Sequence, residues 1–438
     1  NTAVGYDAGG SITTGLQNTL IGGRAGDSLT DADFNVAVGE VALAADTQGS
    51  RSVAIGRAAL NAQNFTSATN AHNTAVGNNA GLSVTTGIHN ILIGGLTGDA
   101  LTDADHNIAI GVSALGADTQ GSKSVAIGKA ALENQNFSSA TDSHNVAVGY
   151  EAGNDITTGK FNSLIGNLAG DAITSANSNT AVGYLALSAE TLGENAVAIG
   201  EQALSNQNFT SSQDSFNTAV GALAGQGCTT GEKNTFIGGK AGGDSTQTGS
   251  KNVAVGWEAG FNLTSGGNNI MVGHQAGRAA SPSGNITTSN HNICLGDDDI
   301  NNFFCADTSI SSSDSRDKAD ITDFNIGLNW IKDLRPITYK WDKRSWYGTD
   351  EEPYGTPDGS KKRSKVHIGF LAQEVLEVEK ANGFADSRDT MLTCNLTEDE
   401  QRYGMKYERL VPILVNAIKE LSAKNDALEA RIKKLEEA

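Results

Sequence analysis

A five-residue motif recurs through the first three hundred residues and restricts the possible folds more than any other feature. It reads Asn-x-Ala/Leu-Val/Ile-Gly in most copies, and as far as Asn217 successive copies are 17, 17, 17 and 21 residues apart, which gives a super-repeat of 72 residues. The extra residues of the fourth step also recur, at Asn61–Phe65, Glu133–Phe137 and Ser205–Phe209. A fixed period of this kind is typical of solenoid proteins. The seventeen copies begin at Asn1, Asn18, Asn35, Ser52, Asn73, Asn90, Asn107, Ser124, Asn145, Asn162, Asn179, Ala196, Asn217, Asn234, Asn252, Asn269 and Asn292.

Each motif places two small or branched apolar residues between a polar residue and a glycine. This pattern predicts a strand of four or five residues, which is too short to fold alone. A glycine at one fixed position suits a corner with positive φ or a close backbone approach, and its frequency argues against helix. We therefore predict a mainly-β protein in which residues 1–300 form a parallel β-solenoid or β-roll rod of seventeen coils.

The side chains of the repeat are mostly Ala, Val and Thr, which cannot fill a wide core. A thin coil of such residues has to bury its apolar face against something else. We expect that partner to be further copies of the same chain, and the expected assembly is a homotrimer. Periodicity alone does not set the number three.

The chain changes composition near residue 312. Residues 1–312 carry 10 Lys and Arg against 26 Asp and Glu and contain 45 of the 52 glycines, whereas residues 313–438 carry 21 against 24. The acidic first part excludes a nucleic-acid footprint, which needs a basic face. Without a run of about 18 apolar residues, no membrane insertion is expected. We predict a linker at residues 301–312 and a second domain at residues 313–438.

Residues that could bind metals occur in the repeat. Five histidines lie beside the motifs, and the pairs at Asp31 and Asp33 and at Asp103 and Asp105 could suggest calcium. Neither acidic pair has the nonapeptide of calcium-binding β-rolls, and the four cysteines have no zinc-ligand spacing. We interpret the histidines as surface or interface positions, the acidic pairs as solvated turns and the cysteines as scattered free thiols. We therefore predict no cofactor and no metal site. The histidines are His72, His89, His106, His144 and His291.

The second domain is predicted to be α+β. Residues 321–341 mix a helical pattern with a strand from Ile337 to Trp341, His367–Phe370 is predicted as a strand, and Leu371–Lys380 as a helix. A final helix is predicted over residues 407–438, and its apolar residues alternate by three and four. This spacing predicts a coiled-coil seam with one buried asparagine that fixes the register. The seam residues, which we predict to drive trimerisation, are Val411, Leu414, Ile418, Leu421, Asn425, Leu428, Ile432 and Leu435.

Two features of this seam leave alternatives open. An amphipathic helix that lies on its own domain would show the same spacing. Ile at one core position with Leu at the other favours dimers in isolated peptides, which conflicts with a trimeric rod. A helix tethered to a trimer need not follow the peptide rule.

Both parts of the chain resemble known families. The repeat resembles the heads of trimeric autotransporter adhesins and related phage fibres, in which Asn-x-x-x-Gly marks each coil of a trimeric β-roll. The second part resembles the intramolecular chaperone of phage tailspikes and tail fibres, the self-cleaving S74 peptidase family. The blocks that carry this resemblance are Ser313–Lys318 with Ile321, Leu334–Tyr339, Gly369–Val375 and Tyr407–Pro412.

The second resemblance implies a single self-cleavage by a Ser-Lys dyad. Ser313 corresponds to the nucleophile and Lys318 to the general base, while Asp314 and Arg316 are assigned only orientation or salt bridging. A serine needs a base to become a nucleophile, and a lysine can be that base where burial lowers its pKa. We favour scission between Ser312 and Ser313, with the Ser313–Asp314 bond as the alternative. A spacing of five residues does not by itself bring the two side chains together.

The sequence therefore predicts a viral tail fibre or tailspike fragment that binds a host-surface receptor, expected to be a glycan. Its second domain would drive trimer folding and then release itself into the host cytoplasm, while the mature part stays on the virion. Segments before Asn1 are expected to attach it to other virion tail proteins.

Three other classes of protein are alternatives. A bacterial trimeric adhesin would end in a membrane-anchoring barrel, whereas this chain ends in charged residues. A polysaccharide-degrading tailspike would need two carboxylates across a groove. A membrane-tethered transcription factor with the same self-cleaving domain would need a basic DNA-binding region and a transmembrane helix.

Overall fold

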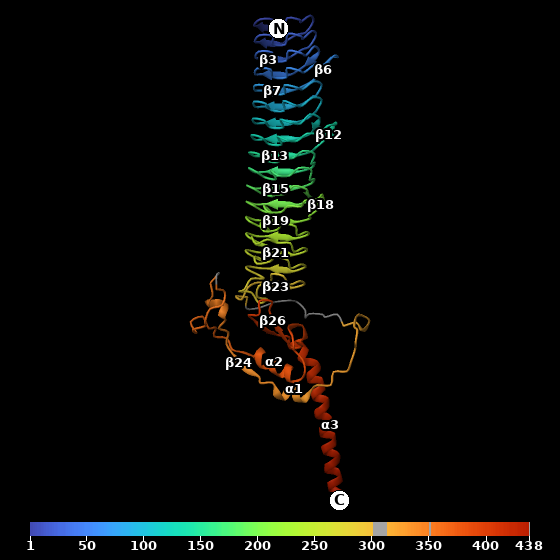
Figure 1. Ribbon diagram of the computed structural model, residues 1–438, viewed down its shortest axis with the longest axis vertical. Helices are drawn as coiled ribbons and strands as arrows, with labels where there is room; N and C mark the ends of the chain where they lie inside the picture. Colours follow the sequence, from blue (N-terminus) through green and yellow to red (C-terminus); the bar gives the residue numbers. More distant parts are fainter. Residues whose placement is uncertain (301–312, 350–351, 438) are drawn as a thin grey trace. The chain divides into compact units, whose positions relative to one another are not determined.

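The computed structural model describes residues 1–300, 313–349 and 352–437 and divides the chain into two compact units (Figure 1). The first unit comprises Asn1–Ala276 and Thr287–Leu295, and the second comprises Gly277–Ile286 and Gly296–Ala438. The segment Gly277–Ile286 thus belongs to the second unit, although the last strand of the solenoid follows it in the chain. The predicted linker at residues 301–312 lies outside the described residues.

The first unit is a parallel β-solenoid, as predicted from the repeat. One strand of three residues from each coil pairs in register with the strand of the next coil, which gives one seventeen-stranded sheet and about sixteen turns between its first and last strands. The strands are β1 (Thr2–Val4), β2 (Thr19–Ile21), β3 (Val36–Val38), β5 (Val53–Ile55), β7 (Thr74–Val76), β8 (Ile91–Ile93), β9 (Ile108–Ile110), β11 (Val125–Ile127), β13 (Val146–Val148), β14 (Ser163–Ile165), β15 (Thr180–Val182), β17 (Val197–Ile199), β19 (Thr218–Val220), β20 (Thr235–Ile237), β21 (Val253–Val255), β22 (Ile270–Val272) and β23 (Ile293–Leu295).

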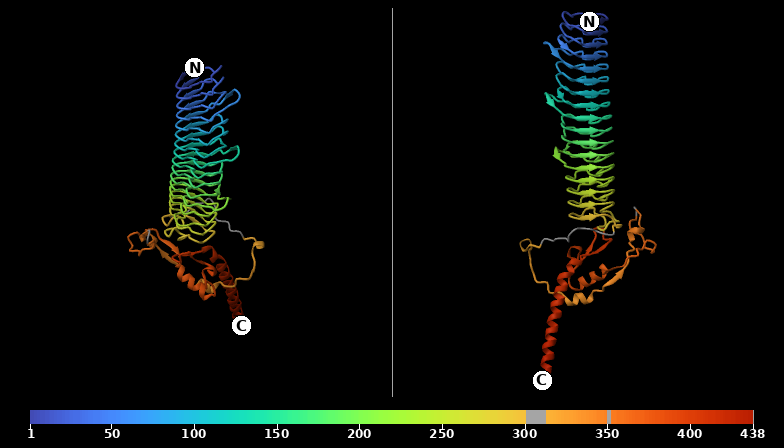
Figure 2. Two further views of the ribbon diagram at one scale, coloured as in Figure 1. Left: turned by 45° about the horizontal axis from the view of Figure 1, so that its top comes forward. Right: turned by 180° about the vertical axis from the view of Figure 1, so that it is seen from behind.

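Three further strand pairs accompany the solenoid. Each arises from one fourth-coil insert, and the inserts project from one side of the solenoid (Figure 2). The pairs are β4 (Gly49–Ser50) with β6 (Thr69–Asn70), β10 (Gly121–Ser122) with β12 (Thr141–Asp142), and β16 (Gly193–Glu194) with β18 (Gln213–Asp214).

A ladder of buried asparagines joins successive coils. The Oδ1 of Asn18 accepts the backbone N–H of Asn35 at 2.9 Å, and the Nδ2 of Asn35 donates to the carbonyl of Gly49 at 2.8 Å. Asn107 makes the equivalent bonds to Ser124 and Gly121, both at 2.9 Å. Each motif asparagine thus satisfies buried backbone groups that the short strands leave unpaired.

The fourth coil replaces this asparagine with a smaller residue, and the insert explains why. Gln135 reaches into the space above Ser124, where its Nε2 donates to the Ser124 hydroxyl at 2.9 Å and to the Asp118 carboxylate at 2.5 Å. Its Oε1 accepts from the Nδ2 of Asn145 at 2.8 Å, so the glutamine bridges the gap in the ladder. Burial raises the pKa of Asp118, although the hydrogen bond from Gln135 opposes the rise.

The motif glycine is required by geometry. Gly111 has a φ of +134°, and a Cβ at this position would lie 2.4 Å from the carbonyl oxygen of Gly128 in the next coil. A side chain here would meet both a disfavoured backbone conformation and a backbone atom that cannot move aside.

The strands of the solenoid have an inner and an outer side. The central residue of nearly every strand is fully buried, as Leu20, Ala37 and Phe236 illustrate, and these residues form a thin core inside the single chain. The first and third residues point outward. The third residue is Val, Ile or Leu in all seventeen strands, and none of these third residues is buried. We call these seventeen third residues the outer strand face.

The second unit contains two short helices, one long helix and two antiparallel strand pairs among its described residues. Strand β24 (Ile337–Tyr339) pairs with β25 (His367–Gly369), and β26 (Cys394–Leu396) pairs with β27 (Tyr403–Met405). The helices are α1 (Leu328–Asp333), α2 (Ala372–Ala381) and α3 (Leu410–Glu436), with 3₁₀ turns η1 (Ser315–Asp317), η2 (Arg344–Tyr347), η3 (Arg388–Thr390) and η4 (Tyr407–Arg409). The predicted fold class, a mainly-β solenoid followed by a small domain with a long terminal helix, is confirmed.

Helix α3 has two different faces. Leu410, Ile413 and Ala417 are buried, and the first two pack with Trp330 of α1 in one core cluster. The predicted seam is exposed instead: Ile418 is 67 % exposed and Leu435 is 71 % exposed. The helix therefore packs on its own domain through residues other than the seam. This geometry disfavours the alternative in which the heptad pattern serves only intrachain packing.

Candidate functional site

The predicted dyad lies on a short turn at the start of the second domain. Asp314 caps the 3₁₀ turn η1, because its carboxylate accepts the backbone N–H of Arg316 at 2.9 Å. The Arg316 guanidinium returns to the same carboxylate, with Nε 3.0 Å from Oδ1. These bonds hold the pKa of Asp314 below its usual range. The pair predicted to orient the site thus closes the turn that separates Ser313 from Lys318.

The turn brings the two predicted catalytic side chains into contact. The Nζ of Lys318 lies 2.7 Å from the Oγ of Ser313 and donates a hydrogen bond to it. This distance is within the range that proton transfer between a nucleophile and its base requires. Ser312, which lies on the acyl side of the favoured cut, is outside the described residues.

Lys318 is not buried in the single chain. Both Ser313 and Lys318 are exposed to solvent, and the turn η1 has no buried residue. A lysine that acts as a base at neutral pH needs a desolvated environment. One chain therefore provides the contact between the two groups but not the surroundings that the chemistry requires.

The remaining blocks of the resemblance assemble into the scaffold of the domain. Arg335 pairs with Glu374, with its Nε 3.0 Å from Oε2. The backbone N–H of Phe370 donates to the Tyr407 hydroxyl at 3.3 Å, and a Cβ on Gly369 would lie 2.5 Å from that same oxygen. Three blocks that are far apart in the sequence thus meet through side chains, and their role here is to hold the domain together.

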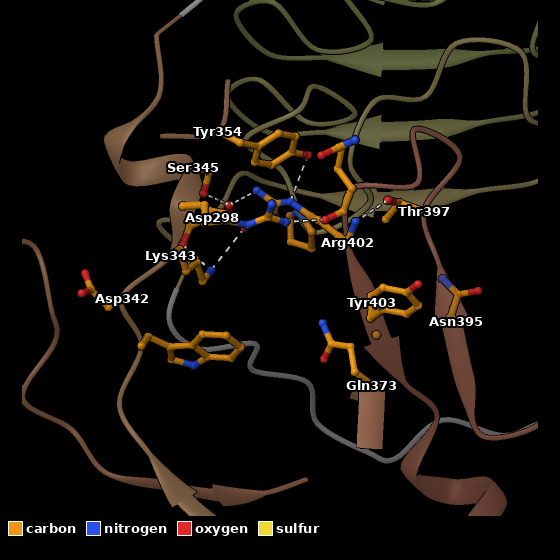
Figure 3. A pocket seen from close by; sticks show the side chains of 15 residues that line it. Asp298, Asp342, Lys343, Ser345, Tyr354, Gln373, Asn395, Thr397, Arg402 and Tyr403 are labelled. Carbon is orange, nitrogen blue, oxygen red and sulfur yellow. Dashed lines mark hydrogen bonds and ion pairs between the residues drawn. The ribbon is translucent and has the colours of Figure 1, made fainter. Parts of the chain in front are cut away.

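A second charged site was not predicted from the sequence. Asp298 is nearly fully buried, and its carboxylate accepts a two-pronged hydrogen bond from Arg402 at 2.9 and 2.5 Å. Lys343 Nζ lies 3.2 Å from the same carboxylate, and the Ser345 hydroxyl also donates to it (Figure 3). We call these four residues the Asp298 cluster. The three partners lie 45 to 104 residues from Asp298 in sequence, so no local pattern could reveal the cluster.

Opposing effects act on the Asp298 carboxylate. Burial alone would raise its pKa, but the hydrogen bonds from Arg402 and Ser345 and the charges of Arg402 and Lys343 outweigh burial and lower the pKa. The cluster borders a cavity of about 490 Å³ that Trp341, Tyr354 and Tyr403 also line (Figure 3).

The two carboxylates that line this cavity do not form a glycosidase pair. Asp298 is held by Arg402 and Lys343, and Asp342 accepts a hydrogen bond from Tyr347. Paired carboxylates in such an enzyme must be free to face a sugar across a groove. The cavity therefore gives no support to the polysaccharide-degrading alternative.

The five histidines considered in the repeat are exposed, and the first three of them stack along the solenoid. The rings of His72 and His89 lie 5.5 Å apart, and those of His89 and His106 lie 4.9 Å apart. The acidic pairs have structural roles, because Asp33 and Asp105 accept backbone N–H groups of a neighbouring coil at 2.7 Å. Across the described ranges there is no group of three His, Cys, Asp or Glu residues that could hold a metal.

The helices of the described residues include none that is long and apolar enough to span a bilayer.

Comparison with known families identifies the region around the candidate dyad. Residues 313–384 match the Peptidase_S74 family model, described as the chaperone of endosialidase. The match begins at Ser313 and ends before the Tyr407 block and helix α3, so the predicted seam lies beyond it. No curated protein matches the chain.

Proposed function

We propose that this chain is part of a viral tail fibre or tailspike whose second domain folds the fibre as a trimer and then cuts itself off. A β-solenoid followed by an S74 chaperone domain fits such a protein. The S74 family is a family of self-cleaving chaperone domains, and the match begins at Ser313. The observation that carries the finer proposal is the 2.7 Å contact between Lys318 Nζ and Ser313 Oγ.

In the proposed reaction, neutral Lys318 accepts the proton of the Ser313 hydroxyl as Oγ attacks the preceding carbonyl carbon, that of Ser312. The C–N bond to Ser313 breaks, and its nitrogen takes up a proton to become the new amino terminus. Water then hydrolyses the ester that links the upstream fragment to Oγ. The alternative bond, Ser313–Asp314, would place the new carboxyl group on Ser313 itself.

Two unpartnered surfaces support the homotrimer. The outer strand face is an apolar strip along all seventeen strands, and large exposed apolar patches mark interaction surfaces. The seam of α3 is exposed over its whole length. We propose that further copies of this chain cover both surfaces, and that assembly also buries Lys318. Cleavage would then wait for correct trimer formation.

Receptor binding is proposed for the solenoid. Its support is the long, repetitive and exposed surface of the coils, which suits adhesion to a repeating glycan better than turnover of a substrate. Binding of the purified rod to an array of host surface glycans tests this part of the proposal. The mature rod would be located on the virion, and the chaperone domain would be released in the host cytoplasm.

The intact mass of the purified chain tests self-cleavage. We expect the wild type to yield two fragments whose masses identify the cut bond, and Ser313→Ala and Lys318→Ala to remain whole. Ser315→Ala, in the same exposed turn, is the matched control and should cleave like the wild type. Lys318→Arg keeps the charge but cannot act as a base at neutral pH, so it should also remain whole. Cleavage of Lys318→Ala at the wild-type rate would refute the dyad.

A further inference from the structure

The proposed cut divides one compact unit into two fragments. The second unit contains Gly277–Ile286 and the described residues 296–300, both upstream of Ser313, together with everything downstream of it. Scission on either side of Ser313 would leave the first two segments joined to the solenoid by the chain. The rest of the unit would belong to the other fragment, so cutting the peptide bond does not in itself separate the fragments.

The Asp298 cluster lies between these two sets of residues. Asp298 comes from the upstream segment, and its partners Arg402, Lys343 and Ser345 all come from downstream. Lys343 also donates to the backbone carbonyl of Asp298 at 2.9 Å. Every hydrogen bond of the cluster therefore connects residues that the cut would place on different fragments (Figure 3).

A second set of contacts reaches the other upstream segment. Arg402 donates through Nη1 to the carbonyl of Ser281 at 2.9 Å, and the Tyr354 hydroxyl donates to the carbonyl of Ala279 at 3.1 Å. Arg402 Nε lies 3.2 Å from the Tyr354 hydroxyl. Arg402 thus binds both upstream segments, through Asp298 and Ser281, and also donates to the Tyr354 hydroxyl.

Burial makes these contacts persistent. The Asp298 side chain is 5 % exposed and that of Arg402 is 16 % exposed, so salt screens their interaction much less than it screens a surface pair. A planar guanidinium that binds both carboxylate oxygens gives a strong, charge-assisted interaction. Separation of the fragments would leave each charge without its partner until water reached it.

We propose that the Asp298 cluster is a retention site that keeps the cleaved chaperone domain bound to the C-terminal end of the fibre fragment. The ligand of the domain is the upstream segment of this same chain, with Asp298 as its anchor and the carbonyls of Ala279 and Ser281 as secondary contacts. Cleavage and release are then two separate steps, and opening of the cluster sets the rate of the second. This inference rests on the proposed cut near Ser313.

To test the retention site, the chain is cut by an added protease, so that the cut does not depend on self-cleavage. A recognition sequence for a site-specific protease replaces part of residues 301–312 in the Ser313→Ala chain, and added protease then cuts the folded protein. The upstream fragment is immobilised through its N-terminus, and the loss of the downstream fragment is followed over time. We expect the two fragments to remain together with the native cluster.

Three variants examine the cluster itself. Asp298→Asn keeps the shape but removes the charge, and it should speed dissociation by at least about tenfold. Arg402→Lys keeps the charge but loses the two-pronged geometry, and it should also dissociate faster. Asp299→Asn is the matched control, because Asp299 pairs with Arg363 at 3.2 Å while 74 % exposed. It should change the rate by less than about twofold.

Circular dichroism of the uncut variants shows whether each is folded before it is cut. Immediate separation of the native fragments, or a folded Asp298→Asn or Arg402→Lys chain that releases at the native rate, would overturn the retention site. Failure of the unmodified wild type to cleave itself would refute the proposed function but would leave this measurement intact.

Discussion

At the scale of single residues, position in the coil decides what each polar group does. An asparagine at the start of the motif satisfies backbone groups of the next coil, whereas Ser124 at the same point makes room for Gln135. The Ser313–Lys318 pair shows the same dependence on surroundings. Its geometry is present in the single chain, but the burial that would make Lys318 a base is absent.

Asp171 gives a prediction about the pH dependence of stability at this scale. Burial, together with the charges of Asp155 and Glu151, raises the pKa of Asp171 to about 6. The folded state therefore binds this proton more tightly than the unfolded state, and the carboxylate costs stability as pH rises from 3.8 through 6. Asp171→Asn should stabilise the rod at pH 7.5 by up to about 1 kcal/mol after solvent screening.

Thermal unfolding of the variant at several pH values measures the effect. The gain should shrink as pH falls and disappear below about pH 3, where Asp171 is protonated in both states. Asp103→Asn, in an exposed turn of the same solenoid, should leave the melting temperature unchanged at both pH values. Equal gains at pH 4 and pH 7.5 would exclude ionisation as the cause.

At the scale of elements, the residue pattern located some segments of the second domain closely and missed others. The predicted strand at His367–Phe370 and helix at Leu371–Lys380 correspond to β25 and α2 within one residue at each end. The helical part of residues 321–341 shortens to α1, which is anchored by the fully buried Trp330. The hairpin of β26 and β27 was not predicted, because its three-residue strands are too short for a recognisable alternation.

The two faces of α3 lead to the next prediction. Ile418 is exposed in the single chain, so a charge at this position should leave the fold of the domain intact. In a coiled coil the same residue would lie in the seam, where a buried charge is strongly unfavourable. Ile418→Asp should therefore convert the proposed trimer to lower-order species and slow the proposed self-cleavage by more than about tenfold.

Native mass spectrometry and the cleavage time course measure these two effects. Lys419→Asp, on the neighbouring exposed position, is the matched control and should remain trimeric and cleave normally. A trimeric Ile418→Asp chain would show that the seam does not hold the assembly together.

At the scale of the whole molecule, two kinds of link join the residues before Ser313 to those after it. One is the peptide bond that the proposed reaction cuts, and the other is the Asp298 cluster, which that reaction leaves in place. The pKa of Asp298 is lowered in the folded state, so its contribution to retention is complete above its usual value of 3.8 and is lost as pH falls through the lowered value. The groups that face it are the cations Arg402 and Lys343 and the Ser345 hydroxyl. Tyr354 lies beside Arg402, and the Tyr354 hydroxyl in turn donates to Asp399.

Release of the nicked downstream fragment at different pH values tests this dependence. Dissociation should stay slow from pH 8 down to pH 5 and accelerate only below about pH 4. In Asp298→Asn this acid-induced step should be smaller, because the titrating carboxylate is absent. A release rate that rises between pH 8 and pH 5 would indicate that another group controls retention.

The sequence by itself determined the solenoid, the boundary of composition near residue 312 and the identity of the candidate dyad. A repeat of fixed period specifies its own register, because each coil offers the next coil an equivalent strand, asparagine and glycine, and resemblance supplied Ser313 and Lys318. Only the tertiary structure decided that these two side chains touch and that the seam of α3 is free. It alone revealed the Asp298 cluster, because contacts between residues up to 104 positions apart depend on how the chain folds back on itself.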